Sequence, residues 1–163
     1  MKLNKTISTV LLLLGLFPIL SYNKKLNSHH LNPDLSQLKG RGNLNHTNLS
    51  NLYLSWSILV RANLANSDLS NSNFHNSNFS WADLKSSNLT GTNLTNTFLL
   101  GADFQDANLT NAKLDGAVLS DSNFIGANLT DISAKKIIGC PSYLPKEWIC
   151  ENNTLKKISK KND

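Results

Sequence analysis

The sequence predicts an all-β solenoid, a regular tube that carries a short segment at each end. From Leu44 to Leu129, every fifth residue is Leu or Phe, without an insertion. The residue two positions earlier is small in nearly every unit, and the residue between them is Asn or Asp in thirteen of eighteen units. A period of five fits neither a helix face nor a simple alternating strand. The chain must therefore turn a corner after every fifth residue.

Each five-residue unit supplies one edge of a coil. The small residue and the Leu or Phe are two positions apart, so both side chains point to the same side of an extended chain. One large and one small inward side chain per edge fill a narrow square tube. Four units make a coil of about twenty residues, and coils stack at the strand spacing of about 4.8 Å. Residues 42–131 hold eighteen units, which make about four and a half coils of this kind.

The units resemble those of a known family. The runs 62–66 (Ala-Asn-Leu-Ala-Asn) and 102–106 (Ala-Asp-Phe-Gln-Asp) resemble the pentapeptide-repeat family, whose pattern is Ala-Asp/Asn-Leu-x-x. The resemblance covers residues 42–131 and implies a right-handed quadrilateral β-helix. Family members often dimerise end to end, so the resemblance allows a homodimer. The segment from Cys140 to Cys150 is similar to an insert common in exported cyanobacterial members.

Residues 1–21 are predicted to be a signal peptide or an N-terminal anchor. Lys2 and Lys5 precede an apolar run of fourteen residues, from Ile7 to Leu20. That run is short for a membrane span, which needs about 20 residues, and suits the apolar region of a signal peptide. We therefore expect export to the periplasm, the thylakoid lumen or the extracellular medium. Contact with a membrane is expected only if the signal is not cleaved.

Residues 22–41 are predicted to be a linker and a short capping helix. Asn32 suits the N-cap, Pro33 suits the first turn and Gly40 suits the stop of a helix. Leu35 and Leu38 would then cover the open first coil. Repeat proteins need such caps, because the exposed end of a stack is an unpaired strand edge.

Residues 132–163 are predicted to be a C-terminal cap with a disulfide loop and a basic tail. Cys140 and Cys150 are the two cysteines of the chain. In an exported protein, an isolated pair at this spacing is most simply one disulfide. Two cysteines without a nearby histidine cannot make a closed zinc site.

The charge distribution argues against a nucleic-acid partner. The net charge is +5, but it is carried by the two ends, whereas residues 42–131 hold three basic residues against seven Asp. One alternative function is a DNA mimic that interacts with gyrase, as in some pentapeptide-repeat proteins, but this needs a long and densely acidic surface. A second alternative is a membrane-surface structural protein, in which the C-terminal lysines contact anionic lipid.

No catalytic set emerges from the sequence. His29 and His30 fall in the predicted linker, while His46 and His75 fall on outward positions of different coils. The Asp residues also fall mainly on outward positions. We therefore predict no catalytic residue, no metal site and no cofactor, and a protein that is not an enzyme.

One face of the predicted tube is a candidate protein-binding face. Outward positions of a soluble solenoid should be polar, yet apolar residues gather on the face that repeats every twenty residues from Ile58. The candidate residues are Ile58, Val60, Trp81, Phe98, Leu100 and Val118. An apolar stripe on one face suggests an interface. Two interpretations stay open: the protein's own tail from Lys135 covers this face, or an unknown protein partner does.

Overall fold

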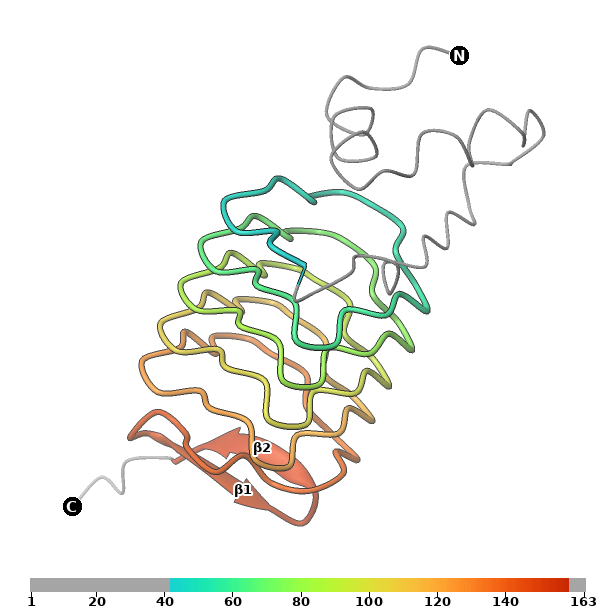
Figure 1. The fold of residues 1–163 in the computed structure, drawn as a ribbon. Helices are drawn as coiled ribbons and strands as arrows, with labels where there is room; N and C mark the ends of the chain where they lie inside the picture. Colours follow the sequence, from blue (N-terminus) through green and yellow to red (C-terminus); the bar gives the residue numbers. More distant parts are fainter. Residues whose placement is uncertain (1–41, 159–163) are drawn as a thin grey trace, which may run out of the picture.

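The computed structural model describes residues 42–158, which form a tube of stacked coils closed at one end by a β-hairpin (Figure 1). The predicted signal (1–21), the predicted linker and capping helix (22–41) and the last five residues lie outside the described residues. Residues 42–158 contain no helix long and apolar enough to cross a membrane. The two strands of the hairpin are β1 (Trp148–Glu151) and β2 (Thr154–Lys157).

Parallel backbone bridges hold the coils together. Each bridge joins residues that are twenty positions apart, as in Asn63↔Asp83 and Asn88↔Asn108. The Leu64 amide donates to the Asp83 carbonyl at 2.7 Å, and the Asn63 amide donates to the Gly42 carbonyl at 2.9 Å. This spacing confirms that four units of five residues make one coil. Because every unit pairs with the units before and after it, the backbone of the inner coils is satisfied within the stack.

The core of the tube is a column of stacked side chains. Every Leu or Phe of the repeat, from Leu44 to Leu129, is buried. Phe74 and Phe79 meet edge to face with ring centroids 5.0 Å apart, and Phe104 stacks on Phe124 at 4.6 Å. Inward Ser and Thr hydroxyls donate to backbone carbonyls, so in the described part of the chain no buried side-chain polar atom lacks a partner.

The last residue of every unit turns the corner with a positive φ. The corner φ angles lie in the left-handed region, for example 58° at Asn66 and 59° at Asn111. This region costs an L-residue with a side chain about 1–2 kcal/mol, and least for Asn, Asp and Gly. The repeat therefore favours these three residue types at its corners.

The coil continues past residue 131, where the run of repeat units in the sequence ends. Ser133 bridges to Lys113, Ile138 to Val118 and Tyr143 to Asn123, so a fifth coil is completed. In this coil the two inward residues exchange sizes. Ala134, which is buried, takes the place of a Leu or Phe, and the larger Ile137, fully buried, takes the place of a small residue. A search for Leu or Phe at every fifth position misses this half of the coil.

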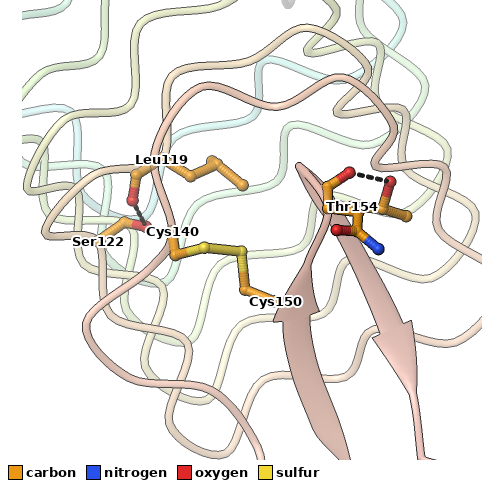
Figure 2. Close-up of a disulfide and its surroundings, with 6 residues drawn as sticks. Leu119, Ser122, Cys140, Cys150 and Thr154 are labelled. Carbon is orange, nitrogen blue, oxygen red and sulfur yellow. Dashed lines mark hydrogen bonds between the residues drawn. A yellow bond between two sulfur atoms is a disulfide. The ribbon is translucent and has the colours of Figure 1, made fainter.

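The C-terminal segment closes the last coil. Strands β1 and β2 pair antiparallel, and Thr154 of β2 bridges to Lys135 at the edge of the fifth coil. Leu155 is buried, and its amide donates to the Ala134 carbonyl at 3.1 Å. A disulfide joins Cys140, at the end of the fifth coil, to Cys150 in β1, with their Cα atoms 5.9 Å apart (Figure 2). The cap thus pairs with an otherwise open strand edge.

Candidate functional site

The tube has four long faces, which differ in their outward side chains. Faces A, B, C and D are centred on residues 44, 49, 54 and 59 respectively, and on every twentieth residue after each of these. On each edge, the residue just before the buried Leu or Phe is the leading outward residue. The residue just after it is the trailing outward residue.

The leading Asn or Asp has a definite structural task. Its side-chain Oδ1 accepts a hydrogen bond from the backbone amide of the trailing residue, as from Thr90 to Asn88 (3.2 Å) and from Ser80 to Asn78 (2.9 Å). This bond is made at every leading Asn or Asp from Asn48 to Asn128. Each such bond contributes on the order of 0.5–1.5 kcal/mol to stability. The Asn/Asp preference of the repeat is therefore a requirement of the fold.

Face D departs from this pattern more than any other face. On faces A and B, every leading residue of the four repeat coils is Asn or Asp. On face D, three of the four are apolar, namely Ile58, Phe98 and Val118. These side chains cannot accept a hydrogen bond, so face D lacks the stabilising contact in three coils.

The apolar residues of face D are aligned by the bridge ladder and open to solvent. Bridges run in sequence from Ile58 through Asn78, Phe98 and Val118 to Ile138. Ile58 is 42% exposed, Phe98 51% and Ile138 58%. The trailing residue Val60 is also exposed, whereas Leu100 and Val118 are half-buried. The structure thus brings the predicted residues together and adds Ile138, which lies beyond the sequence pattern.

Two tryptophans stand at the corners that flank face D. Trp56 turns the corner from face C into face D, and Trp81 turns the corner from face D into face A. Both have positive φ, 65° and 63°, where Asn, Asp or Gly is favoured. Both are more than half exposed. Each tryptophan therefore adopts a backbone conformation that costs conformational energy.

The indole of Trp81 has a fixed resting place on the next coil. A Cβ atom on Gly101, which follows Trp81 by one coil, would lie 2.3 Å from Cε3 of the indole. Gly101 also has a φ of 62°. Glycine at this position therefore serves both the corner and the close approach of the ring.

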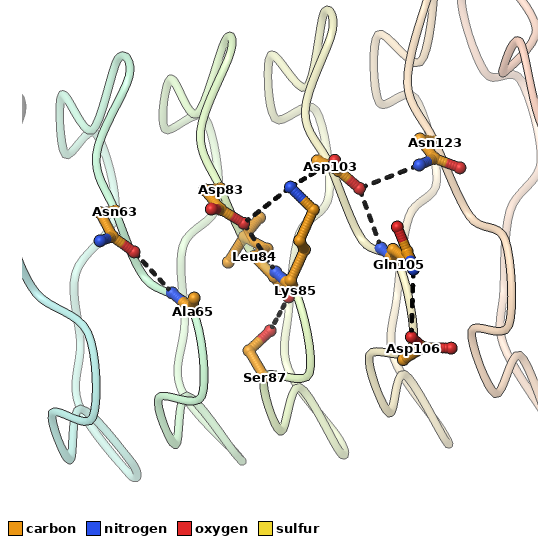
Figure 3. Close-up of polar contacts among 10 residues, drawn as sticks. All are labelled: Asn63, Ala65, Asp83, Leu84, Lys85, Ser87, Asp103, Gln105, Asp106 and Asn123. Atoms are coloured by element: carbon orange, nitrogen blue, oxygen red, sulfur yellow. Dashed lines mark hydrogen bonds and ion pairs between the residues drawn. The ribbon is translucent and has the colours of Figure 1, made fainter.

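Face A shows what a polar face of this tube looks like. Lys85 Nζ lies 2.9 Å from Oδ2 of Asp103 and 3.7 Å from Oδ1 of Asp83, and so bridges two stacked carboxylates (Figure 3). The hydrogen bond to Asp103 is the main cause that raises the pKa of Lys85 above its ordinary value. Where Asn replaces Asp, the amide takes this role, as when Asn123 Nδ2 donates to Asp103 Oδ1 at 3.0 Å.

The C-terminal segment, as far as residue 158, does not cover face D. Its hairpin packs against the end of the fifth coil, where Trp148 and Leu144 contact the core. Phe98 stays half exposed on face D. The described part of the tail therefore gives no support to the interpretation that the tail covers this face.

The described residues hold no group of three or more His, Cys, Asp or Glu that could bind a metal ion. His46 lies at the corner that leads from face A into face B, and His75 lies on face C. The structure does not bring the two together with an acid or a nucleophile in any site described above.

Comparison with known proteins identifies the family. The family described as pentapeptide repeats matches residues 47–85, 82–121 and 102–133, with eight copies of the repeat. The chain belongs to the pentapeptide-repeat family. Its fold is accordingly the right-handed quadrilateral β-helix that the repeat predicted. Pentapeptide-repeat proteins are generally non-catalytic structural or binding proteins.

Several solved pentapeptide-repeat structures are similar to this chain. Rfr23 from the cyanobacterium Cyanothece 51142 is 33% identical with a TM-score of 0.32, and the match covers 60% of this chain and 66% of Rfr23. The protein alr5209 from Nostoc Pcc 7120 is 33% identical with a TM-score of 0.41, and the match covers 56% of this chain and 77% of that one.

HetL, from the cyanobacterium Nostoc sp. strain PCC 7120, is described as involved in heterocyst differentiation regulation. It is 26% identical with a TM-score of 0.35, and the match covers 60% of this chain and 55% of HetL. The chain thus spans less than two thirds of Rfr23 and about half of HetL. No curated protein matches the chain.

Proposed function

We propose that this pentapeptide-repeat protein is an exported, non-catalytic scaffold that binds another protein through face D. The observation that carries the proposal is the loss of the leading Asn or Asp at Ile58, Phe98 and Val118. Faces A and B keep this residue in every repeat coil, and its hydrogen bond stabilises the fold. Face D lacks this stabilising hydrogen bond in three coils and exposes apolar surface instead. Binding sites commonly lower the stability of the fold in this way.

The size of the apolar strip suggests what kind of partner it fits. From Ile58 to Ile138 the ladder makes four steps between coils, which is about 19 Å at the usual strand spacing. One edge of the tube is only a few residues wide, so the strip is long and narrow. An apolar segment of another polypeptide, lying along the tube axis, matches this shape better than a broad domain face does.

Export is supported by the disulfide between Cys140 and Cys150. Disulfides persist in oxidising compartments and are rare in the cytosol. The bond ties the cap to the last coil, so it belongs to the folded structure. The predicted signal at residues 1–21 is consistent with this compartment.

Affinity isolation from the source organism, followed by reconstitution with the purified partner, tests the proposal. The full chain is compared with the variant Phe98→Asn/Leu100→Ser, which makes the centre of face D polar. We expect the variant to fold and to lose the partner, with a decrease in affinity of about a hundredfold, because two central apolar contacts are removed.

The matched control alters the same coil on another face. The variant Asn88→Ser/Thr90→Ser changes the leading and trailing residues of face B, which lie one edge before face C. This control should retain the partner. If the face D variant binds as tightly as the unchanged chain, or if the face B variant loses binding equally, face D is not the binding site.

A further inference from the structure

A mixed polar and aromatic groove lies at the corner between faces D and A, near the first coils. It has a volume of about 670 Å³ and is open to solvent. The residues that line it are Asn43, Arg61, Ala62, Asn63, Trp81 and Asp83. An indole, a guanidinium, a carboxylate and two amides therefore meet in one groove.

Trp81 forms an aromatic wall that is held in place. Its ring lies against Gly101 on the next coil, where a Cβ atom would collide with the indole. The side chain is nevertheless 52% exposed. A ring that is fixed on one side and open on the other can receive a flat apolar surface without losing much side-chain freedom.

The polar groups beside Trp81 retain hydrogen-bonding capacity for a ligand, although Asp83 also pairs with Lys85, whose Nζ lies 3.7 Å from Oδ1 of Asp83. In the part of the chain that the structure describes, the Arg61 guanidinium makes no ion pair or side-chain hydrogen bond. Oδ1 of Asp83 accepts from the Lys85 amide at 3.1 Å, while Oδ2 of Asp83 has no hydrogen-bond partner among the same residues. The amide ladder that joins Asn63 to Asn43 at 3.1 Å stops at Asp83, because a carboxylate has no N–H to donate to Asn63.

We propose that this groove binds a sugar ring of a glycan. One side of a pyranose ring presents C–H groups, which pack on an indole, and its rim presents hydroxyls, which both donate and accept hydrogen bonds. Trp81 would hold the C–H side, Asp83 would accept from one hydroxyl, and Arg61 would donate to another. Arg61 and Asp83 line the groove, and the adjoining Lys85 pairs with both Asp83 and Asp103. These charges balance, which suits an uncharged ligand better than a phosphate or a carboxylate.

The corner position of Trp81 adds independent support. Its φ of 63° is one that Asn, Asp or Gly adopts more easily, and Arg61 at the same corner has a φ of 59°. Two stacked corners of this edge therefore carry large side chains in place of the residues that the fold prefers. Strain of this kind points to a role outside the fold.

Indole N–H signals in an NMR titration test the proposal on the full chain. The probes are hexasaccharides of β-1,4-glucose, α-1,4-glucose, β-1,4-N-acetylglucosamine and β-1,4-xylose, each up to about 10 mM, which detects millimolar affinity. We expect at least one of them to shift the Trp81 signal while the Trp148 signal stays in place. If none of the four shifts the Trp81 signal, the proposal is wrong.

Matched variants separate this site from the protein-binding face. Trp81→Asn places a favoured residue at the corner, so the variant should fold, and its affinity for the sugar should fall at least about tenfold. Asp83→Asn should also lower the affinity for the sugar, but the protein partner should stay bound to face D. Trp56→Asn and Phe98→Asn should leave the sugar affinity unchanged. Sugar binding that survives in Trp81→Asn would place the ligand elsewhere and contradict the assignment.

Discussion

Faces B and D of this tube are built on the same backbone and the same kind of core, yet their surfaces are opposite in chemistry. Inward Leu or Phe residues are buried on both faces. Face B carries Asn or Asp as every leading residue, and each makes its hydrogen bond to the trailing amide. Face D carries Asn only at Asn78 and apolar residues in the other three repeat coils.

The difference separates what the fold requires from what it tolerates. Burial of the core and the positive φ at corners are required in every coil. The leading Asn or Asp is preferred but can be given up, because its hydrogen bond is one of many in a coil. A face on which it is given up in most coils is a candidate for a role other than folding. On this chain that face is face D.

The largest expected effect concerns the core, where the two faces should behave alike. Phe79→Ala on face D should lower the free energy of unfolding by about 3–5 kcal/mol, and Leu89→Ala on face B by about 2–5 kcal/mol, because each leaves a cavity in a fully buried column. Urea denaturation of the two variants measures both values. A much smaller loss on one face would mean that the two faces do not share an equivalent core.

The next largest effect concerns the C-terminal cap, whose stability should not depend on the outward residues of faces B and D. The double variant Cys140→Ser/Cys150→Ser should lower the free energy of unfolding by up to about 3 kcal/mol, since it removes the constraint on the unfolded chain. Hydrogen exchange should show faster exchange in β1, β2 and the fifth coil, with the first coils unchanged. Uniformly faster exchange along the tube would contradict a local cap.

A smaller effect concerns the leading residue, in which faces B and D differ. Phe98→Asn should raise the free energy of unfolding by about 0.5–1.5 kcal/mol, because the new side chain can accept from the Leu100 amide. The reverse change on face B, Asn88→Phe, removes the bond from Thr90 and should lower the value by a similar amount. Thermal and urea unfolding of the two variants check the signs. If Phe98→Asn destabilises the protein, the apolar residue at 98 serves the fold after all.

The smallest effect concerns the ion bridge of face A. Lys85→Met should cost at most about 1 kcal/mol near neutral pH, because the bridge to Asp83 and Asp103 is partly exposed. The pKa of Lys85 is raised in the folded protein. The contribution of its charge to the free energy of unfolding is therefore complete below the ordinary lysine pKa. It is lost as the pH rises through the higher pKa of the folded protein. Unfolding measured at neutral pH and above pH ~10.4, the ordinary lysine value, should show the difference between the two proteins shrinking.

The repeat made the fold and most of the candidate face predictable. Leu or Phe at every fifth position identifies the inward residues, so the outward residues follow by counting. The second half of the fifth coil was not predictable from this pattern, because Ala134 occupies a large inward position and Ile137 a small one. Ile138 was missed for the same reason.

Other features depend on contacts that no spacing reveals. The sequence singled out the preference for Asn or Asp, but not the hydrogen bond from the trailing amide that explains it. The groove beside Trp81 also escaped notice. Trp81 and Asp83 are neighbours in the sequence, but Arg61, one coil earlier, is brought beside them only by the stacking of coils.

The most direct test of a functional face D is site-specific photo-cross-linking in cells of the source organism. A photoreactive phenylalanine analogue replaces Phe98 on face D in one protein and Asn88 on face B in another, so that the same leading position of the same coil is probed twice. We predict one dominant cross-linked protein from position 98 and none from position 88. The purified partner should compete for the cross-link at position 98. Equal cross-linking from the two positions, or none from position 98, would contradict the account.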